Sequence, residues 1–175
     1  KNNQWDYTKF IGRQISGLTI GIIGYGRLGK FMARYCHCLG ARVVIYDPFC
    51  ENDDKINQYN NYDQIEDIVK ICDVISLHTH VKDDTKNSIN SSLLKNAKKG
   101  LYIIYTARGE IVNERDIIDG LRSNQIAGYA TDVISDELGD ITGSPILKGV
   151  QEGLNIIVTP HIGGMSLEGP KKTYS

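Results

Sequence analysis

The segment from Gly24 to Gly29 has the spacing Gly-x-Gly-x-x-Gly, which can bring backbone N–H groups against the phosphates of a dinucleotide. Gly24 would permit a tight turn, Gly26 would let the backbone approach the pyrophosphate, and Gly29 would let a helix pack closely on a strand. The N–H groups at the start of that helix would then face the phosphates. Arg27 could add a charge-assisted contact. The predicted phosphate-binding residues are Gly24, Gly26, Arg27, Leu28 and Gly29.

An acid at the expected distance strengthens this interpretation, because glycine-rich turns also serve ordinary packing. Asp47 ends the next predicted strand, 47 − 24 = 23 positions after Gly24. A carboxylate there accepts hydrogen bonds from ribose hydroxyls and repels a 2′-phosphate. No arginine follows in the segment Asp-Pro-Phe-Cys-Glu to bind such a phosphate. The pair of features predicts NAD rather than NADP, and the alternative is an aspartate that simply faces solvent at a strand end.

Short runs rich in isoleucine and valine alternate with amphipathic stretches. The runs predict six strands, at Leu18–Ile23, Arg42–Tyr46, Val74–Leu77, Leu101–Tyr105, Ala127–Asp132 and Ile156–Val158. Their lack of polar alternation is typical of strands covered on both faces. Helices are predicted at Arg27–Leu39, Asp63–Ile71 and Asn113–Arg122. Strands that alternate with helices pair in parallel through right-handed crossovers, which predicts an α/β fold, a Rossmann-type doubly wound parallel sheet with helices on both faces.

Local signals set the ends of these helices. Gly40 is predicted to end the first helix, and Asn113 is predicted to cap another, with Asp116 completing a variant of the capping box. The first helix carries an apolar stripe of Leu28, Met32, Tyr35, Cys36 and Leu39. The stretch Val133–Asn155 has no clear period and is predicted to be a long loop at a strand end, where such folds often place functional residues.

Composition excludes several classes of function. The net charge of −1 offers no basic surface to nucleic acid, and no apolar run approaches the length of a membrane span. Among the four cysteines, Cys36 and Cys38 flank His37 on a predicted helix, where positions two apart face different ways. No metal site is therefore expected. Free thiols, buried or half-buried, indicate a reducing cytoplasm.

Five segments in order carry a resemblance to one family. They are GRQISGLTIGIIGYGRLGK, CDVISLHTHVKDDTKNSIN, TARGEIVNERDIIDGL, AGYATDVISDE and NIIVTPHIGG, and together they run from about Trp5 to about Gly169. The sequence resembles the NAD-binding domain of the D-isomer-specific 2-hydroxyacid dehydrogenases. The resemblance implies hydride transfer between NAD(H) and a 2-keto or 2-hydroxy acid.

The resemblance also implies three catalytic residues. Arg108 would bind the substrate carboxylate and polarise the carbonyl, since a guanidinium presents a fixed fork of donors. His161 would exchange the proton, and Glu137 would orient the imidazole and favour its protonated form. Arg108 could instead be an ordinary surface residue and His161 a structural histidine. Glu137 could be solvated, with Asp136 the functional acid by a slip of one residue.

Further cofactor-binding residues follow from the same resemblance, namely Thr79, Thr106, Ala107, Arg108, Asp132, His161, Gly163 and Gly164. Asp132 would hold the nicotinamide side of the cofactor, and His78 is expected to be structural, with its backbone beside the adenosine. The sequence departs from the family pattern at three positions. Tyr105 replaces an asparagine, and His80 and Leu138 replace prolines.

The chain begins with Lys1 and is expected to be one NAD-binding domain, residues 1–175, cut from a longer enzyme whose discontinuous substrate domain is absent. Alone it should bind NAD without efficient turnover. The resemblance implies a homodimer formed through this domain, with an entry helix that contains Trp5 offering apolar surface. One alternative function is an NAD-sensing scaffold that binds peptides. Another is formate dehydrogenase, which would carry Gln in place of Glu137, or adenosylhomocysteine hydrolase, which should lack both TARG and TPHIGG.

Overall fold

The structure is a computed structural model that describes residues 8, 11–50 and 58–167. Its strands are β1 (Thr19–Ile23), β2 (Arg42–Tyr46), β3 (Asn60–Asn61), β4 (Val74–Leu77), β5 (Leu101–Tyr105), β6 (Ile126–Thr131) and β7 (Ile156–Val158). They form a parallel sheet in the order β3-β2-β1-β4-β5-β6-β7. The six predicted strands are confirmed to within one residue at every end, and the α/β doubly wound fold is confirmed. The two-residue β3 was not predicted.

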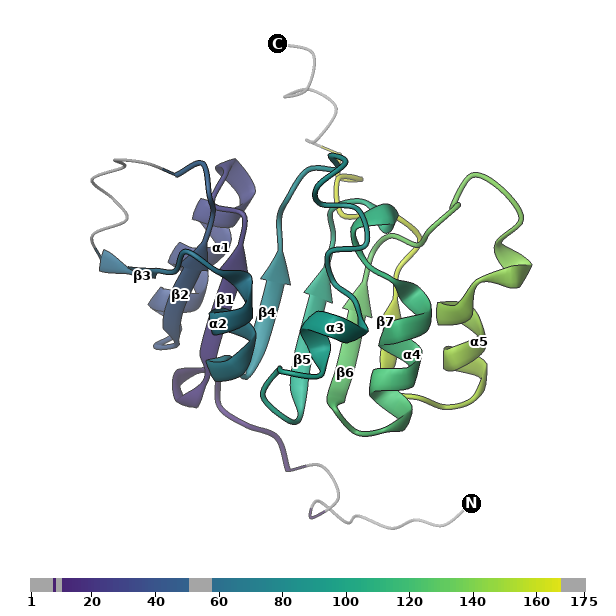
Figure 1. Cartoon of the computed structure of the whole chain (residues 1–175), viewed down its shortest axis with the longest axis horizontal. Coiled ribbons are helices and arrows are strands. Elements are labelled where there is room, and N and C mark those ends of the chain that lie inside the picture. Colours follow the sequence, from purple (N-terminus) through teal and green to yellow (C-terminus); the bar gives the residue numbers. More distant parts are fainter. Residues whose placement is uncertain (1–7, 9–10, 51–57, 168–175) are drawn as a thin grey trace.

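Helices lie on both faces of this sheet (Figure 1). They are α1 (Arg27–Cys38), α2 (Ile65–Ile71), α3 (Ser91–Leu94), α4 (Glu114–Arg122) and α5 (Pro145–Gln151). In Figure 1, α2 to α5 lie in front of the sheet and α1 lies behind β1 and β2. Two buried clusters correspond to these two layers, a larger one under α2 to α5 and a smaller one under α1. Part of the rear face is open, because Tyr102 and Ile104 of β5 and Ile157 of β7 are exposed.

The predicted apolar stripe of α1 is wrong in most of its members. The buried residues of this helix are Gly29, Ala33 and Cys36. Leu28, Tyr35 and Leu39 are exposed instead. The reason lies at Gly29, where a Cβ atom would overlap the carbonyl oxygen of Gly24. The helix sits so close to the preceding turn that only small side chains fit against the sheet.

Caps account for the ends of the helices. Gly40 has a φ of +84° and its N–H bonds to the carbonyl of His37, as the sequence predicted for the end of α1. The Asn113 side chain accepts the N–H of Asp116 at 3.3 Å, which confirms the predicted cap of α4. The carboxylate of Asp116 does not close the box. It accepts the N–H of Ser91 at 2.7 Å and so ties α3 to α4.

The stretch expected to be a loop, Val133–Asn155, contains helix α5, so that prediction is wrong there. The side chain of Ser144 accepts the N–H of Leu147, and Pro145 occupies the first turn. A serine followed by proline is a recognised start signal. The helix has only seven residues and packs through Ile146 and Gly149, which is too short for an apolar period to show.

Candidate cofactor and active site

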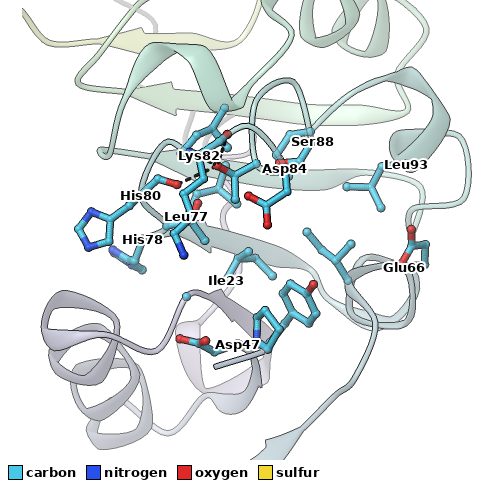
Figure 2. Close-up of a pocket in the computed structure, with 18 of the residues that line it drawn as sticks. Ile23, Asp47, Glu66, Leu77, His78, His80, Lys82, Asp84, Ser88 and Leu93 are labelled. Atoms are coloured by element: carbon cyan, nitrogen blue, oxygen red, sulfur yellow. Dashed lines mark hydrogen bonds between the residues drawn. The ribbon is translucent and has the colours of Figure 1, made fainter. Parts of the chain in front are cut away.

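A pocket of about 490 Å³ opens at the carboxyl edge of the sheet. Its walls come from the segments that follow β1, β2 and β4, and from α2 and α3 (Figure 2). The strand order reverses between β1 and β4, and ligands of doubly wound sheets bind at such a point. The volume lies within the usual range for small-molecule sites.

The glycine-rich turn forms the edge of this pocket. Gly24 has a φ of +91°, and a Cβ on it would lie 2.9 Å from the carbonyl oxygen of His78, so both conformation and space require glycine. A Cβ on Gly26 would meet no atom within 4 Å, which leaves open space for a ligand beside the start of α1. Arg27 and Leu28 are exposed, and neither side chain lines the pocket.

Asp47 fixes the turn as well as lining the pocket. Its Oδ2 accepts the N–H of Tyr25 at 2.7 Å, and its Oδ1 accepts the N–H of Phe49 at 2.9 Å. Each carboxylate oxygen keeps a further lone pair that a ribose hydroxyl could use. Thr79 lines the same pocket, packed against Gly24. The structure thus brings Gly24, Gly26, Asp47 and Thr79 to one cavity.

The three residues expected to be catalytic follow three neighbouring strands. Arg108 follows β5, Glu137 follows β6 and His161 follows β7. The Nδ1 atom of His161 lies 2.7 Å from Oε1 of Glu137, with the two side chains 45% and 31% exposed. The loop therefore turns Glu137, rather than the exposed Asp136, toward the imidazole. Because Nδ1 is held by Glu137, Nε2 is the nitrogen left for a substrate.

Arg108 does not join this pair. Among the described residues, no hydrogen bond or ion pair links its guanidinium to Glu137 or His161. It is exposed and donates from Nη1 to the carbonyl of Ala107 at 2.8 Å. Its N–H donates to the hydroxyl of Tyr105 at 3.2 Å. Tyr105 is buried, and burial raises its pKa. The tyrosine that departs from the family pattern thus braces the backbone of Arg108 from inside the turn.

Thr106 is exposed and Ala107 is half-buried, and neither lines the pocket. The same is true of Gly163 and Gly164, which follow His161 in an exposed turn. The predicted residues therefore fall into two groups. One group, Gly24, Gly26, Asp47 and Thr79, shares a cavity, and the other, which follows β5, β6 and β7, lies along the open carboxyl edge of those strands.

Asp132 anchors the turn that carries His161. The carboxylate is buried and accepts hydrogen bonds from the Thr159 hydroxyl, from the N–H of Ile162 at 3.0 Å and from the N–H of Gly163 at 2.7 Å. Burial opposes its ionisation, but these hydrogen bonds, together with the nearby His161, hold the pKa of Asp132 below its usual value. They also hold His161 at a φ of +52°, which is unusual for a residue other than glycine.

Sequence reasoning missed one residue that shapes the site. Glu114 is buried at the start of α4, and its Oε1 accepts the N–H of Ser135 at 2.6 Å. Its Oε2 faces the Ser144 hydroxyl at 3.5 Å. Burial raises the pKa of Glu114, and the hydrogen bonds from Ser135 and Ser144 partly offset that effect. Glu114 therefore holds both ends of the loop that carries Glu137. The only sequence signal for this role is that Glu114 is an acid at the first position of a helix.

Comparison with known proteins decides the family. A family described as "D-isomer specific 2-hydroxyacid dehydrogenase, NAD binding domain" matches residues 1–163. The chain belongs to this family. It is 34% identical over 170 residues to the (S)-sulfolactate dehydrogenase of Chromohalobacter salexigens, covering 97% of the chain and 53% of that protein. It is 32% identical over 172 residues to the D-3-phosphoglycerate dehydrogenase of Rattus norvegicus, covering 98% and 31%.

A solved structure agrees with the assignment. D-lactate dehydrogenase with NAD+ from Lactobacillus jensenii superposes with a TM-score of 0.84 at 28% identity, over 95% of this chain and 52% of that one. The chain thus spans about a third to a half of these relatives. As a domain of this family it binds NAD, and the open space at Gly26 and the carboxylate of Asp47 fit that cofactor.

The remaining expectations concern other chemistry. In the described part of the chain, no helix could cross a membrane and no three His, Cys, Asp or Glu side chains gather as metal ligands. The four cysteines are free thiols, but Cys38 is exposed rather than buried or half-buried, so that expectation is wrong for one of them. Trp5 lies outside the described residues.

Proposed function

We propose that this domain belongs to an enzyme that interconverts a D-2-hydroxy acid and its 2-keto acid. The Glu137–His161 pair carries the proposal, because it lies at the same carboxyl edge of the sheet as the pocket, and no described residue bonds to Nε2 of the imidazole. NAD(H), when bound, supplies or accepts the hydride. Arg108 binds the substrate carboxylate, with a guanidinium fork suited to that group. His161 delivers a proton from Nε2 to the carbonyl oxygen, and Glu137 holds the ring at Nδ1.

The second wall of the active site would come from another part of the full-length protein. Relatives are roughly two to three times as long as this chain, which covers 53% of one and 31% of another. Arg108 and His161 are exposed at the sheet edge, as residues facing an interdomain cleft would be. We therefore assign residues 1–175 to the NAD-binding domain, with substrate selection left mainly to the rest of the protein.

A panel of 2-keto acids with NADH, assayed on the full-length protein, tests this function. We expect turnover of at least one keto acid, and His161→Ala should reduce it roughly 10²- to 10⁴-fold, the usual worth of a positioned acid. NAD affinity should change little. A full-length protein that binds NADH, turns over no keto acid and captures peptides would instead be the NAD-sensing scaffold.

Assembly as a homodimer is also part of the proposal. Helix α1 turns Leu28, Phe31, Tyr35 and Leu39 outward, and these residues repeat at the spacing of one helix face. Leu28 is 65% exposed and Tyr35 is 53% exposed. A second copy related by twofold symmetry would bury such a stripe against itself. Light scattering at tens of micromolar should show a dimer, and Tyr35→Glu should shift it to monomer. A monomer in the unmodified chain contradicts this assembly.

A further inference from the structure

Two loops meet over the dinucleotide pocket through a lysine and a phenylalanine. Phe49 follows β2 and Lys82 follows β4, and both line the pocket. The Nζ atom of Lys82 lies 4.2 Å from the centre of the Phe49 ring. In Figure 2, the Lys82 side chain extends from the upper wall toward the wall that carries Asp47. A cation so placed over an aromatic face is attracted by it.

This contact places a positive charge in the pocket that Asp47 also lines. Phe49 is two residues from Asp47, and its N–H is held by Oδ1 of Asp47 at 2.9 Å. The backbone of Phe49 and the carboxylate are therefore fixed to one another, and the ammonium lies over the phenylalanine ring. Within the described part of the chain, Lys82 makes no ion pair.

The ribose 2′ position is where the two nicotinamide cofactors differ. An acid at the end of β2 disfavours a 2′-phosphate, whereas a nearby cation accommodates it. The segment after Asp47 contains no basic residue before Glu51, and on sequence alone the carboxylate would act unopposed. The fold brings Lys82 to this place from a different strand, 35 residues further along the chain (82 − 47 = 35).

We propose that Lys82 is a cofactor-specificity residue, whose ammonium binds the 2′-phosphate of NADP(H) beside Asp47. Asp47 still favours NAD(H) over NADP(H). Lys82 reduces this preference below the value that the carboxylate alone would give. The proposal rests on the assignment of the adenosine ribose to Asp47. Asp84 and Glu66 also line the pocket, but neither forms an ion pair with Lys82.

Calorimetry of NADH and NADPH binding to the 175-residue chain tests the proposal. Lys82→Met keeps most of the aliphatic stem and removes the charge. Its dissociation constant for NADPH should rise about threefold to tenfold, the worth of one charge-assisted contact at an exposed site, with NADH changed less than twofold. Lys82→Arg, the matched control, should retain NADPH binding. The effect should shrink as salt is added.

Two results overturn the proposal in different ways. Equal losses of NADH and NADPH affinity in Lys82→Met, or no loss of NADPH affinity, would show that Lys82 does not contact the 2′-phosphate. The same comparison is repeated on Asp47→Asn, which removes the repulsion and should raise the affinity for NADPH relative to that for NADH. If Asp47→Asn leaves the ratio of the two affinities unchanged, the ribose does not bind at Asp47 and the underlying assignment fails as well.

Discussion

Replacing Asp132 by asparagine should loosen the turn that holds His161. The carboxylate accepts three hydrogen bonds, and two of their donors are backbone N–H groups, at Ile162 and Gly163. An asparagine can keep one oxygen in place, but its NH₂ group must then face an N–H donor. One hydrogen bond to a charged acceptor is lost, which costs about 1.5–3 kcal/mol. We expect the free energy of unfolding to fall by about that amount near neutral pH.

The pH dependence of this loss distinguishes a charge effect from a packing effect. Because the pKa of Asp132 is lowered in the folded protein, its ionisation stabilises the fold at pH values above the unfolded pKa of about 3.9. That stabilisation disappears as the pH falls through the lower pKa of the folded state. The difference in stability between the wild type and Asp132→Asn should therefore be full at about pH 7 and smaller at about pH 3.

Urea unfolding of the domain at several pH values measures both effects. Asp136→Asn is the control, because Asp136 is an exposed acid in the following loop and has a φ of +58°, which asparagine also tolerates. It should change stability by less than about 0.5 kcal/mol. The reasoning is refuted if Asp132→Asn is as stable as the wild type, or if the gap between them is the same at low and neutral pH.

Two further predictions follow from charges at hydrogen-bond distance. In the full-length protein, Glu137→Gln removes the carboxylate that lies 2.7 Å from Nδ1 of His161 and orients the ring, so the rate of keto-acid reduction should fall, while Asp136→Asn leaves it unchanged. A fall with Asp136→Asn alone would make Asp136 the orienting acid. Asp73→Asn should lower the free energy of unfolding by roughly 2–3 kcal/mol near neutral pH. Burial opposes ionisation of Asp73, but hydrogen bonds from Lys98, Thr19 and Arg13 hold its pKa below normal. That loss should shrink in acid as the wild-type carboxylate takes up a proton, and a loss independent of pH in chemical denaturation would contradict it.

The strands could be predicted because buried parallel strands have a strong local signal, whereas their order in the sheet came from the structure. Runs such as Thr19–Ile23 and Leu101–Tyr105 are apolar enough to stand out without knowledge of their neighbours. Helix α1 was placed correctly, but its buried face was not. The apolar period pointed to Leu28 and Tyr35, whereas the close approach at Gly29 decided which residues face the sheet. That contact depends on the tertiary structure.

The site residues likewise divide into those that the sequence predicts and those whose roles depend on the tertiary structure. Asp47 was predicted from its distance to the glycine-rich motif, and Glu137 and His161 were predicted from the family resemblance. Glu114 and Lys82 were not, because their roles arise from contacts with residues 21 and 33 positions away (135 − 114 = 21 and 82 − 49 = 33). Tyr105 was noticed only as a departure from the family pattern. The hydrogen bond from the Arg108 N–H to its hydroxyl gives it a structural role that spacing could not reveal.

Three carboxylates in this domain accept hydrogen bonds from backbone N–H groups of nearby loops, and this affects how mutations at the site are interpreted. Asp47 accepts two backbone N–H groups, Asp132 accepts two, and Glu114 accepts that of Ser135. Each acid therefore holds a loop at the carboxyl edge whether or not a ligand is present. Loss of NADH affinity in Asp47→Ala is thus not evidence of a ribose contact, because releasing Tyr25 also disturbs the glycine-rich turn.

A ratio of affinities separates the two roles of Asp47. A disturbed turn weakens the hold on the pyrophosphate, which NADH and NADPH share, so both affinities should fall by the same factor. A lost contact at the ribose changes the two affinities differently, because only NADPH carries a phosphate there. The ratio of NADH to NADPH affinity therefore reports on Asp47 and Lys82 as specificity residues, and the absolute affinity reports on the turn.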